Sequence, residues 1–474
     1  MSDKTTQVAI LGGGPAGYAA AFKCADLGLE TTLIDLAPNP GGVCLYSGCI
    51  PSKALLHVSK LINEAGEAGN WGISFNKPEI DLDKLRAWKN SVIEQLTGGL
   101  GMLRNSRGID HVQGRGTLKD ANTIEVALAD GDTASITAEH IIVAVGSHPT
   151  RIPDISIDSE RVLDSTSGLE LPVIPGSLLV IGGGYIGLEL GSVYASLGSE
   201  VSVVEMTDGL LPGADRDLVK VLQGRLSKVF KNIMFNTRVT KVEEAASGLE
   251  VHFDGETDET TQKYDYILVA VGRQPNSQDL GLENAGIAID DRGFVTVDAQ
   301  RRTNVPNIFA VGDIAGEPML AHKGSHEGMV AAEVIAGGRV AFEAEAIPAV
   351  VFTDPELAWC GLTETEAEAA GRKVNVTKFP WAASGRAISI DRPDGLTKIL
   401  FDPETERVLG VGICGAGAGE MIAEGVLAVE MAALATDLKL SIHPHPTLSE
   451  TIMEAAEMVG GASTHIYRPK KKQH

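Results

Sequence analysis

One pattern occurs twice in this chain and constrains its fold more than any other feature. Residues 8–17 read Val-Ala-Ile-Leu-Gly-Gly-Gly-Pro-Ala-Gly, which predicts a strand, a tight glycine turn and the start of a helix. Residues 179–187 repeat this order at an offset of 170 residues. The second strands of the two copies, 31–35 and 201–205, each end in an acid 23 residues after the first glycine. Two such strand–helix–strand units predict an α/β fold built on parallel sheets.

The glycines and the acid of each unit have separate chemical roles. The glycines let the backbone approach a pyrophosphate held at a helix N-terminus, and the acid accepts hydrogen bonds from a ribose diol. A glycine motif alone carries little weight in a chain with 54 glycines, but strand, glycines, helix and acid together predict a dinucleotide site. We therefore expect two Rossmann-like domains and two dinucleotides. The predicted ligands are Gly12, Gly14, Gly17 and Asp35 in the first unit, and Gly182, Gly184, Gly187 and Glu205 in the second.

Three further apolar segments predict strands that end in glycine. They are residues 141–146, residues 267–272 and residues 308–313. Their apolar residues need no role beyond the core. The terminal Gly146, Gly272 and Gly312-Asp313 fall at carboxyl ends of strands, where open α/β sheets place their ligands. We expect these ends to lie beside the dinucleotides.

Cys44 and Cys49 lie five residues apart, directly after the first unit. Pro51 suits the first turn of a helix, so Cys49 is expected near a helix N-terminus, where the dipole lowers a thiol pKa. Lys53 follows Cys49 by four residues and therefore falls on the same helical face. A thiolate, a cation and a nearby redox ring would form a dithiol/disulfide electron relay. Taken alone, the spacing also fits two buried, reduced cysteines.

The cysteine count and the N-terminal sequence favour a reducing compartment. Five cysteines, an odd total in a long chain, do not suggest a secreted disulfide framework. The N-terminus lacks an apolar signal core, and no run of about twenty apolar residues predicts a membrane span. We expect a protein of the bacterial cytoplasm. A mature mitochondrial matrix protein would look the same once its presequence had been removed.

Length and charge set further limits. A chain of 474 residues should hold roughly three or four domains. The net charge of -23 argues against nucleic acid as a partner, because phosphates would be repelled. The basic end 470–472 is short and is interpreted as a solvated tail.

The order of the motifs resembles that of the pyridine nucleotide–disulfide oxidoreductases. The cysteine pair, both glycine units, the Gly312-Asp313 turn and a C-terminal His-Pro-Thr-Leu-Ser-Glu at 445–450 occur in the family's order across nearly the whole chain. The resemblance implies an FAD-binding domain with the redox disulfide over 1–150 and an NAD-binding domain over 151–276. It also implies a return to the FAD-binding domain over 277–346 and a C-terminal α+β dimerisation domain over 347–474. Within this last domain, the sequence predicts strands over 396–401 and 408–413 and a long helix over 419–435, apolar on more than one face.

The resemblance also assigns roles to individual residues. FAD would bind the first unit and Asp313, and NAD the second unit. Cys49 would face the flavin and Cys44 would exchange with substrate, while Lys53 and Glu189 would pair beside the flavin ring. The further residues that it assigns to cofactor binding are Gly42, Val43, Gly116, Val145, Gly146, Ser147, Val239, Gly272, Met319, Leu320, Ala321 and His322. It implies no metal.

His445 is the expected proton carrier, oriented by Glu450 five residues later. Thiol–disulfide exchange needs a base with a pKa near 7, and histidine is the usual choice. His443 is close enough to be confused with it, but His445 begins the motif match. In this family the histidine comes from the partner subunit, which implies an obligate homodimer.

Within the family, the chain is most similar to enzymes that oxidise a protein-bound dihydrolipoyl dithiol and reduce NAD. The lipoyl group would belong to another protein, in a 2-oxo acid dehydrogenase complex or the glycine cleavage system. Glutathione-type reductases need cations for NADPH, whereas Glu205 is followed by no Lys or Arg over 206–215. Mercuric reductases and large thioredoxin reductases need a C-terminal redox pair, and no cysteine follows Cys414. A flavoprotein that only binds or senses is a further alternative, against which His445 and Glu450 count.

Three residues depart from the usual family pattern. Val43 stands where Thr is common, Tyr46 where Asn is common, and Asp35 where many members have Glu. The Asp for Glu change preserves the ribose acceptor. Tyr46 stands between the two cysteines and is placed to alter access to Cys44, which makes substrate identity harder to predict than reaction class.

Overall fold

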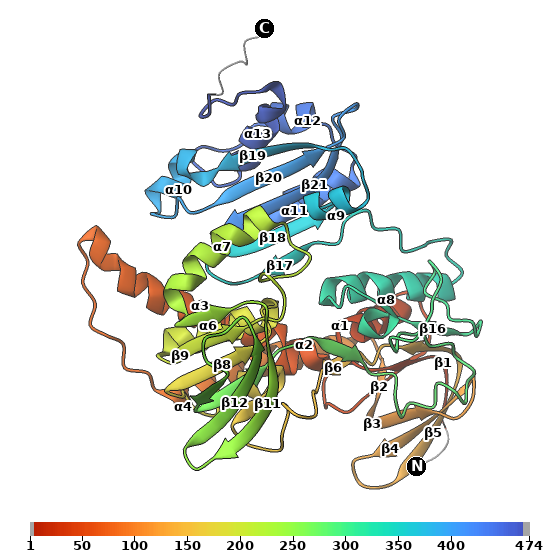
Figure 1. Ribbon diagram of the computed structural model, residues 1–474. Coiled ribbons are helices and arrows are strands. Elements are labelled where there is room, and N and C mark those ends of the chain that lie inside the picture. Colours follow the sequence, from red (N-terminus) through yellow and green to blue (C-terminus); the bar gives the residue numbers. More distant parts are fainter. Residues whose placement is uncertain (1–3, 468–474) are drawn as a thin grey trace.

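The protein is described by a computed structural model over residues 4–467, so the basic segment 470–472 lies outside the described residues. Figure 1 shows three regions: two α/β regions side by side and a third, C-terminal region above them. No helix of the described residues is both long and apolar enough to cross a membrane.

The first region is built on a mainly parallel sheet. Strands β3, β2, β1, β5 and β16 run parallel in that order, and the antiparallel β4 pairs with the remaining parts of β3 and β5. The strands are β1 (Lys4–Leu11), β2 (Thr31–Asp35), β3 (Asp110–Leu118), β4 (Thr123–Leu128), β5 (Thr133–Val143) and β16 (Ile308–Ala310). The helices are α1 (Pro15–Asp26), α2 (Gly42–Ser47), α3 (Cys49–Glu67), α4 (Leu82–Ser106) and α8 (Ala321–Ile335). Short 3₁₀ turns lie at Ala68–Trp71 and at Gly312–Ala315 (η2).

The second region repeats this architecture. Its five parallel strands follow the order β10, β9, β8, β14, β7, and a three-stranded antiparallel sheet, β11 to β13, lies beside them. The strands are β7 (Val162–Leu163), β8 (Ser177–Ile181), β9 (Glu200–Val204), β10 (Asn232–Met234), β11 (Thr237–Ala245), β12 (Gly248–Gly255), β13 (Thr261–Tyr264) and β14 (Tyr266–Val269). The helices are α5 (Ser165–Leu169), α6 (Tyr185–Leu197) and α7 (Arg216–Val229).

The chain returns to the first sheet after leaving the second. Strands β6 (Ser147–Pro149) and β15 (Arg273–Pro275) pair antiparallel where the chain passes between the two regions. β16 then pairs with β5, and α8 packs against α1. Residues far apart in sequence therefore share the first sheet.

The C-terminal region is an antiparallel sheet with helices. Its strand order is β17, β18, β21, β20, β19. The strands are β17 (Ala349–Val351), β18 (Glu356–Gly361), β19 (Asn375–Pro380), β20 (Leu396–Phe401) and β21 (Val408–Gly415). The helices are α9 (Glu364–Ala369), α10 (Gly385–Ser389), α11 (Ala418–Glu430), α12 (Ala435–Leu440) and α13 (Glu450–Glu457), with 3₁₀ turns at Trp381–Ala383 and Met458–Gly460.

The predicted α/β class with an α+β C-terminal region is confirmed, but one expected helix is shorter than the sequence indicated. A single helix over 419–435 was expected, whereas α11 ends at Glu430 and α12 begins at Ala435. Ala432 between them adopts a φ of 52°, which a continuous helix does not allow. The amide of Val408 bonds to the carbonyl of Ala433, so β21 holds this break in place.

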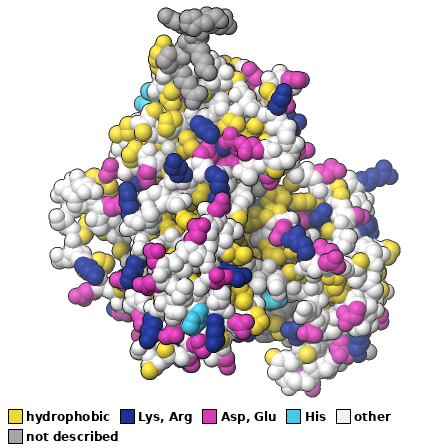
Figure 2. Space-filling model, in the orientation of Figure 1, with side chains coloured by type: hydrophobic (Ala, Val, Ile, Leu, Met, Phe, Trp, Pro, Cys, Tyr) yellow, Lys and Arg dark blue, Asp and Glu magenta, His cyan; other side chains and the backbone are white. Residues whose placement is uncertain are grey.

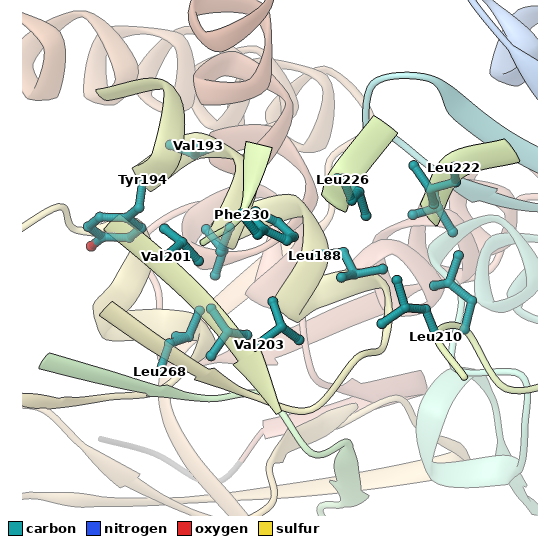
Figure 3. Close-up of a cluster of buried hydrophobic side chains, with 14 of the residues drawn as sticks. Leu188, Val193, Tyr194, Val201, Val203, Leu210, Leu222, Leu226, Phe230 and Leu268 are labelled. Carbon is teal, nitrogen blue, oxygen red and sulfur yellow. The ribbon is translucent and has the colours of Figure 1, made fainter. Parts of the chain in front are cut away.

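Each region has a buried apolar core, and one buried lysine ties two regions together. In the second region, Leu188 of α6, Leu222 of α7 and Phe230, directly after α7, pack into the core beside the sheet (Figure 3). Lys398 on β20 is 1% exposed and pairs with Asp215 at 2.8 Å and Asp217 at 3.1 Å at the start of α7. Glu364 completes the cluster at 2.5 Å. Breaking a buried charge pair by removing one partner costs about 3–5 kcal/mol, so these contacts fix the C-terminal region on the second.

Candidate active site

A cavity of about 500 Å³ runs through the first region and ends beside the two cysteines. Its walls come from the glycine turn after β1, the starts of α2, α3 and α8, and the turn at Gly312–Asp313. The start of α6 closes it from the second region. Figure 2 shows charged side chains of both signs spread over the surface and a hollow with hydrophobic side chains right of centre.

Close backbone contacts require glycine at Gly12 of the first unit and at Gly42 in the loop beside it. Gly12 has a φ of +105°, and a Cβ there would lie 2.4 Å from the carbonyl oxygen of Ala144. A Cβ on Gly42 would lie 2.5 Å from the Cα of Gly14. Asp35 accepts hydrogen bonds from the amides of Gly13, at 2.5 Å, and Ala37, at 2.8 Å. The carboxylate is thereby fixed at the cavity wall, and the cavity and its side-chain-free turn fit FAD.

The second unit reproduces this geometry outside the cavity. Gly182 has a φ of +107°, and Glu205 accepts from the amides of Gly183 at 2.7 Å and Thr207 at 2.8 Å. Nothing lies within 4 Å of a Cβ placed on Gly184, so the approach to this turn is open. The start of α6 thus offers a free backbone surface beside a fixed carboxylate, which suits a second dinucleotide.

Not every residue expected at a cofactor lines the cavity. Those that do are Gly12, Gly14, Asp35, Gly42, Val43, Lys53, Val145, Gly146, Ser147, Glu189, Asp313, Met319, Leu320 and Ala321. Gly17 lies against the carbonyl of Gly12 instead, and Gly116 packs beneath Leu11. His322 Nε2 hydrogen-bonds to the carbonyl oxygen of Pro348 at 2.8 Å, so this histidine joins α8 to the C-terminal region. Val239 is buried on β11.

The two cysteines lie on adjoining helices at one end of the cavity. Cys44 is on α2, and Cys49 is the first residue of α3, which agrees with the helix N-terminus expected near Cys49. Both are free thiols that hydrogen-bond to each other, and Cys49 is accessible from the cavity. The hydrogen bond from Cys44 and the charge of Lys53 lower the pKa of Cys49 to about 7, whereas the pKa of Cys44 is raised. Cys49 is therefore the thiol that carries the negative charge.

Lys53 and Glu189 form the expected ion pair between the two regions. Lys53 Nζ lies 2.8 Å from Glu189 Oε2, and the side chain of Glu189 is 4% exposed. The hydroxyl of Ser52 donates to the same oxygen at 2.9 Å, and the amide of Phe352 donates to Oε1 at 3.0 Å. The ammonium group also lies 4.5 Å from the centre of the Phe352 ring. These contacts hold a cation beside Cys49.

His445 is held by Glu450 at the far end of the chain. Its Nδ1 lies 2.9 Å from Glu450 Oε1, and the other carboxylate oxygen accepts from the amide of Thr447 at 2.8 Å. The carboxylate keeps the proton on Nδ1, so Nε2 is the atom that can accept a proton. The histidine side chain is 71% exposed.

One chain does not bring His445 to the cysteines. The loop between α12 and α13 lies at the top of Figure 1, and α2 lies near its centre. His443, by contrast, is engaged elsewhere: it bonds to Glu424 at 2.8 Å and to the carbonyl of Ser441 at 2.8 Å, and its side chain is 7% exposed. Of these two histidines, only His445 presents a ring nitrogen to the surface.

The side chain of Tyr46 points toward the loop that follows Asp35. Its hydroxyl donates to the carbonyl of Asn39 at 3.0 Å, and its ring lies against Gly41. It therefore braces the loop that follows Asp35 while lining the cavity beside Cys44.

Apart from Glu189, which the family resemblance placed beside the flavin, sequence reasoning missed the residues of the second region that line this cavity. Tyr185, Ile186 and Arg273 line it, and desolvation raises the pKa of Tyr185 to about 12. Tyr185 and Ile186 are the variable residues of the second glycine motif, so their position just before Gly187 was the available signal. Nothing local indicated that α6 would face the other cofactor.

Comparisons with known families agree with this geometry. The model of the family "Pyridine nucleotide-disulphide oxidoreductase" matches residues 6–328. The model of its dimerisation domain matches residues 347–456.

Relatives and solved structures cover nearly the whole chain. A dihydrolipoyl dehydrogenase of Vibrio cholerae is 51% identical over 98% of both chains. One from Bacillus subtilis is 43% identical, again over 98% of both. The crystal structure of LpdA from Mycobacterium tuberculosis superimposes with a TM-score of 0.89 at 30% identity, covering 96% of this chain and 99% of the other. A flavoprotein disulfide reductase, RclA from Escherichia coli, gives a TM-score of 0.86 at 28% identity, covering 97% and 100%.

Proposed function

Because the chain belongs to the pyridine nucleotide-disulphide oxidoreductase family, we propose that it oxidises protein-bound dihydrolipoyl groups and reduces NAD. The observation that carries the proposal is the position of Cys44 and Cys49 at the end of a dinucleotide cavity, beside the Lys53–Glu189 pair. FAD bound in this cavity supplies the two-electron acceptor between the dithiol and NAD.

The chain's own thiols carry out the exchange with substrate. In the oxidised protein, a substrate thiolate attacks the Cys44 sulfur of the Cys44–Cys49 disulfide and displaces the Cys49 thiolate. The second substrate thiol then attacks the mixed disulfide, which releases the lipoyl disulfide and leaves both cysteines reduced. Lys53 stabilises the displaced thiolate, in agreement with the lowered pKa of Cys49.

His445 supplies the proton transfers that this exchange requires. A dithiol must lose protons to form a disulfide, and Nε2 of His445 accepts them while Glu450 stabilises the charged ring. Because one chain keeps His445 away from the cysteines, the working site draws its histidine from a second subunit. The match to the dimerisation domain supports this homodimer.

Glu205 sets the choice of nicotinamide dinucleotide. Its carboxylate is fixed by backbone amides and is 8% exposed, and no Lys or Arg follows over 206–215. It accepts hydrogen bonds from a ribose diol and repels a 2′-phosphate, so NAD is used in preference to NADP.

The partner is a lipoyl-bearing protein of a 2-oxo acid dehydrogenase complex or the glycine cleavage system. The names of the relatives support this choice, because the dihydrolipoyl group is their substrate. The bacterial cytoplasm is the proposed location. Three buried free thiols, Cys24, Cys360 and Cys414, suit a reducing compartment.

One steady-state comparison tests the function. The FAD-loaded protein is assayed with dihydrolipoamide and NAD, and separately with glutathione disulfide and NADPH. Activity with the first pair and none with the second is expected. The reverse result would contradict the proposal, and Glu205→Gln should narrow the preference for NAD over NADP without changing FAD content.

A further inference from the structure

Three strands of two different sheets end in the same way. β5, β14 and β16 each run into a glycine with positive φ: Gly146 at +71°, Gly272 at +113° and Gly312 at +78°. The residues that follow these glycines are Ser147, Arg273 and Asp313. All three line the cavity, so the repeated strand ends deliver three polar side chains to one place.

These side chains form a continuous chain of hydrogen bonds. Arg273 donates from Nε to Ser147 Oγ at 2.8 Å and from Nη2 to the carbonyl of Ser147 at 2.6 Å. Ser147 Oγ donates to Asp313 Oδ2 at 2.5 Å. Ser147 is 2% exposed, so solvent does not compete for its hydroxyl.

The chemistry of these groups decides which of them donates and which accepts in each hydrogen bond. A guanidinium can only donate, so Ser147 Oγ accepts from Arg273 and must direct its single proton at Asp313. A hydrogen bond to a carboxylate is shorter and stronger than one between neutral groups, which agrees with the 2.5 Å separation. Arg273 therefore sets the orientation of the Ser147 hydroxyl, and the hydroxyl holds the carboxylate of Asp313.

This series of hydrogen bonds also joins two regions of the molecule. Arg273 begins β15, which leaves the second sheet, whereas Ser147 and Asp313 follow strands of the first sheet. Its guanidinium charge also favours the ionised form of Tyr185 at the start of α6. Arg273 thus lies where the wall of the FAD cavity meets the second dinucleotide unit.

We propose that Arg273 is a positioning residue that acts through Ser147 on Asp313 and so controls how tightly the protein retains FAD. This inference rests on the proposed function in one respect, that Asp313 contacts FAD. It implies that the NAD-binding region governs the residence of the other cofactor.

A purely mechanical role would have a different signature. The pairing of β6 with β15 already joins the regions through their backbones. If Arg273 only braced this ribbon, its replacement would lower stability whether or not Ser147 and Asp313 were intact. If it acts through Ser147, the effect must depend on both.

The test is a double-mutant cycle on the rate of FAD release from the loaded full-length protein, followed by flavin fluorescence after dilution. Arg273→Met and Ser147→Ala should each speed release about tenfold, because each removes a charge-assisted hydrogen bond from the chain. The double variant should release FAD no faster than the more severe single variant. In an Asp313→Asn background, Arg273→Met should add little.

Arg238→Met is the matched control. Arg238 lies in the same region, is 66% exposed and pairs only with the exposed Asp254, so its replacement should leave FAD release unchanged. Arg273→Lys keeps the charge but loses the two-point contact with Ser147, and should fall between the parent and Arg273→Met. This variant carries the test if Arg273→Met does not fold.

An unchanged rate of FAD release in the Arg273 variants would overturn the inference. So would a double variant whose rate of FAD release rises by the product of the two single effects. Failure of the proposed function would be recognised separately, as an unaltered protein that retains no FAD or does not oxidise dihydrolipoamide.

Discussion

The thiol half and the histidine half of the candidate site differ in how the chain surrounds them. Cys44 and Cys49 lie at the end of a cavity whose walls come from two regions, and their cation is held by Glu189 from the second region. His445 is held by a carboxylate five residues away and is 71% exposed. The thiol half therefore depends on how the regions pack, whereas the histidine half is formed locally.

This difference agrees with the proposal that a complete site needs two copies of the chain. A cavity that sets the pKa of a thiol must be enclosed, and enclosure comes from long-range packing within one chain. An acid–base that serves an incoming substrate must face outward. The two halves can therefore be disabled independently, which makes the comparison testable.

The largest effect is expected from Cys49→Ser. Without this sulfur no disulfide forms, so dithiol oxidation should stop, and the long-wavelength absorbance of a thiolate beside the flavin should be absent after two-electron reduction. Absorbance spectra during titration with dithionite measure this. Cys360→Ser, at a buried position outside the cavity lining, should retain both properties. Survival of the band in Cys49→Ser would show that Cys49 is not the charged thiol.

The next effect is that of His445→Gln. Loss of a positioned acid–base costs about a hundred- to ten-thousandfold in rate, while the thiol half and the bound flavin should keep their spectra. Mixing this variant with Cys44→Ser subunits should restore activity, because one site of each mixed dimer then draws an intact Cys44 and an intact His445 from different chains. Verified mixed dimers without activity would place both halves in one chain.

Lys53→Met should change the pH dependence of the thiol half. Cys49 has a pKa of about 7, below that of an ordinary thiol, so its thiolate band should be present above this pH and lost as the pH falls through it. Removing the cation should move this midpoint upward by about one unit or more. The band is followed against pH in the reduced protein. Because Glu189 opposes the thiolate, Lys53→Met with Glu189→Gln should show a smaller upward shift, and equal shifts would argue that Glu189 has no such influence.

His443→Gln should have the smallest catalytic effect. His443 is engaged with Glu424 and the carbonyl of Ser441, so the rate should stay close to that of the parent. Losing these contacts should lower the free energy of unfolding by about 1 kcal/mol, which a shift in denaturant midpoint measures. A rate loss as large as that of His445→Gln would reverse the assignment of the two histidines.

The bounds of helices and strands were predictable where the local sequence pattern and the tertiary contacts favour the same structure. The strand at 31–35 and the strand at 396–401 have the bounds that the sequence indicates. The helix expected over 419–435 ends earlier, at Glu430. The apolar periodicity continues past this residue, but the hydrogen bond from β21 to Ala433 holds the following residues out of helical geometry. Tertiary contacts decide such ends.

The site was predictable in its chemistry but not in its assembly. The sequence predicts Cys49 near a helix N-terminus, and in the structure Cys49 is the first residue of α3. The ion pair of Lys53 with Glu189 joins residues 136 apart and came only from the family resemblance. Arg273 and Tyr185 escaped prediction because their contacts arise when two separately encoded regions pack together.

Helix α6 limits how this protein could be redesigned. One side of the helix packs Leu188 and Val193 into the core of the second region, while Tyr185, Ile186 and Glu189 line the cavity of the first. Attempts to change dinucleotide preference within the first turn of α6 would therefore disturb flavin and thiols together. Glu205, the acid at the end of β9, does not serve two sites in this way, because its carboxylate contacts only its own unit. Cofactor engineering, and natural drift between NAD and NADP, should accordingly concentrate at Glu205 and the residues just after it.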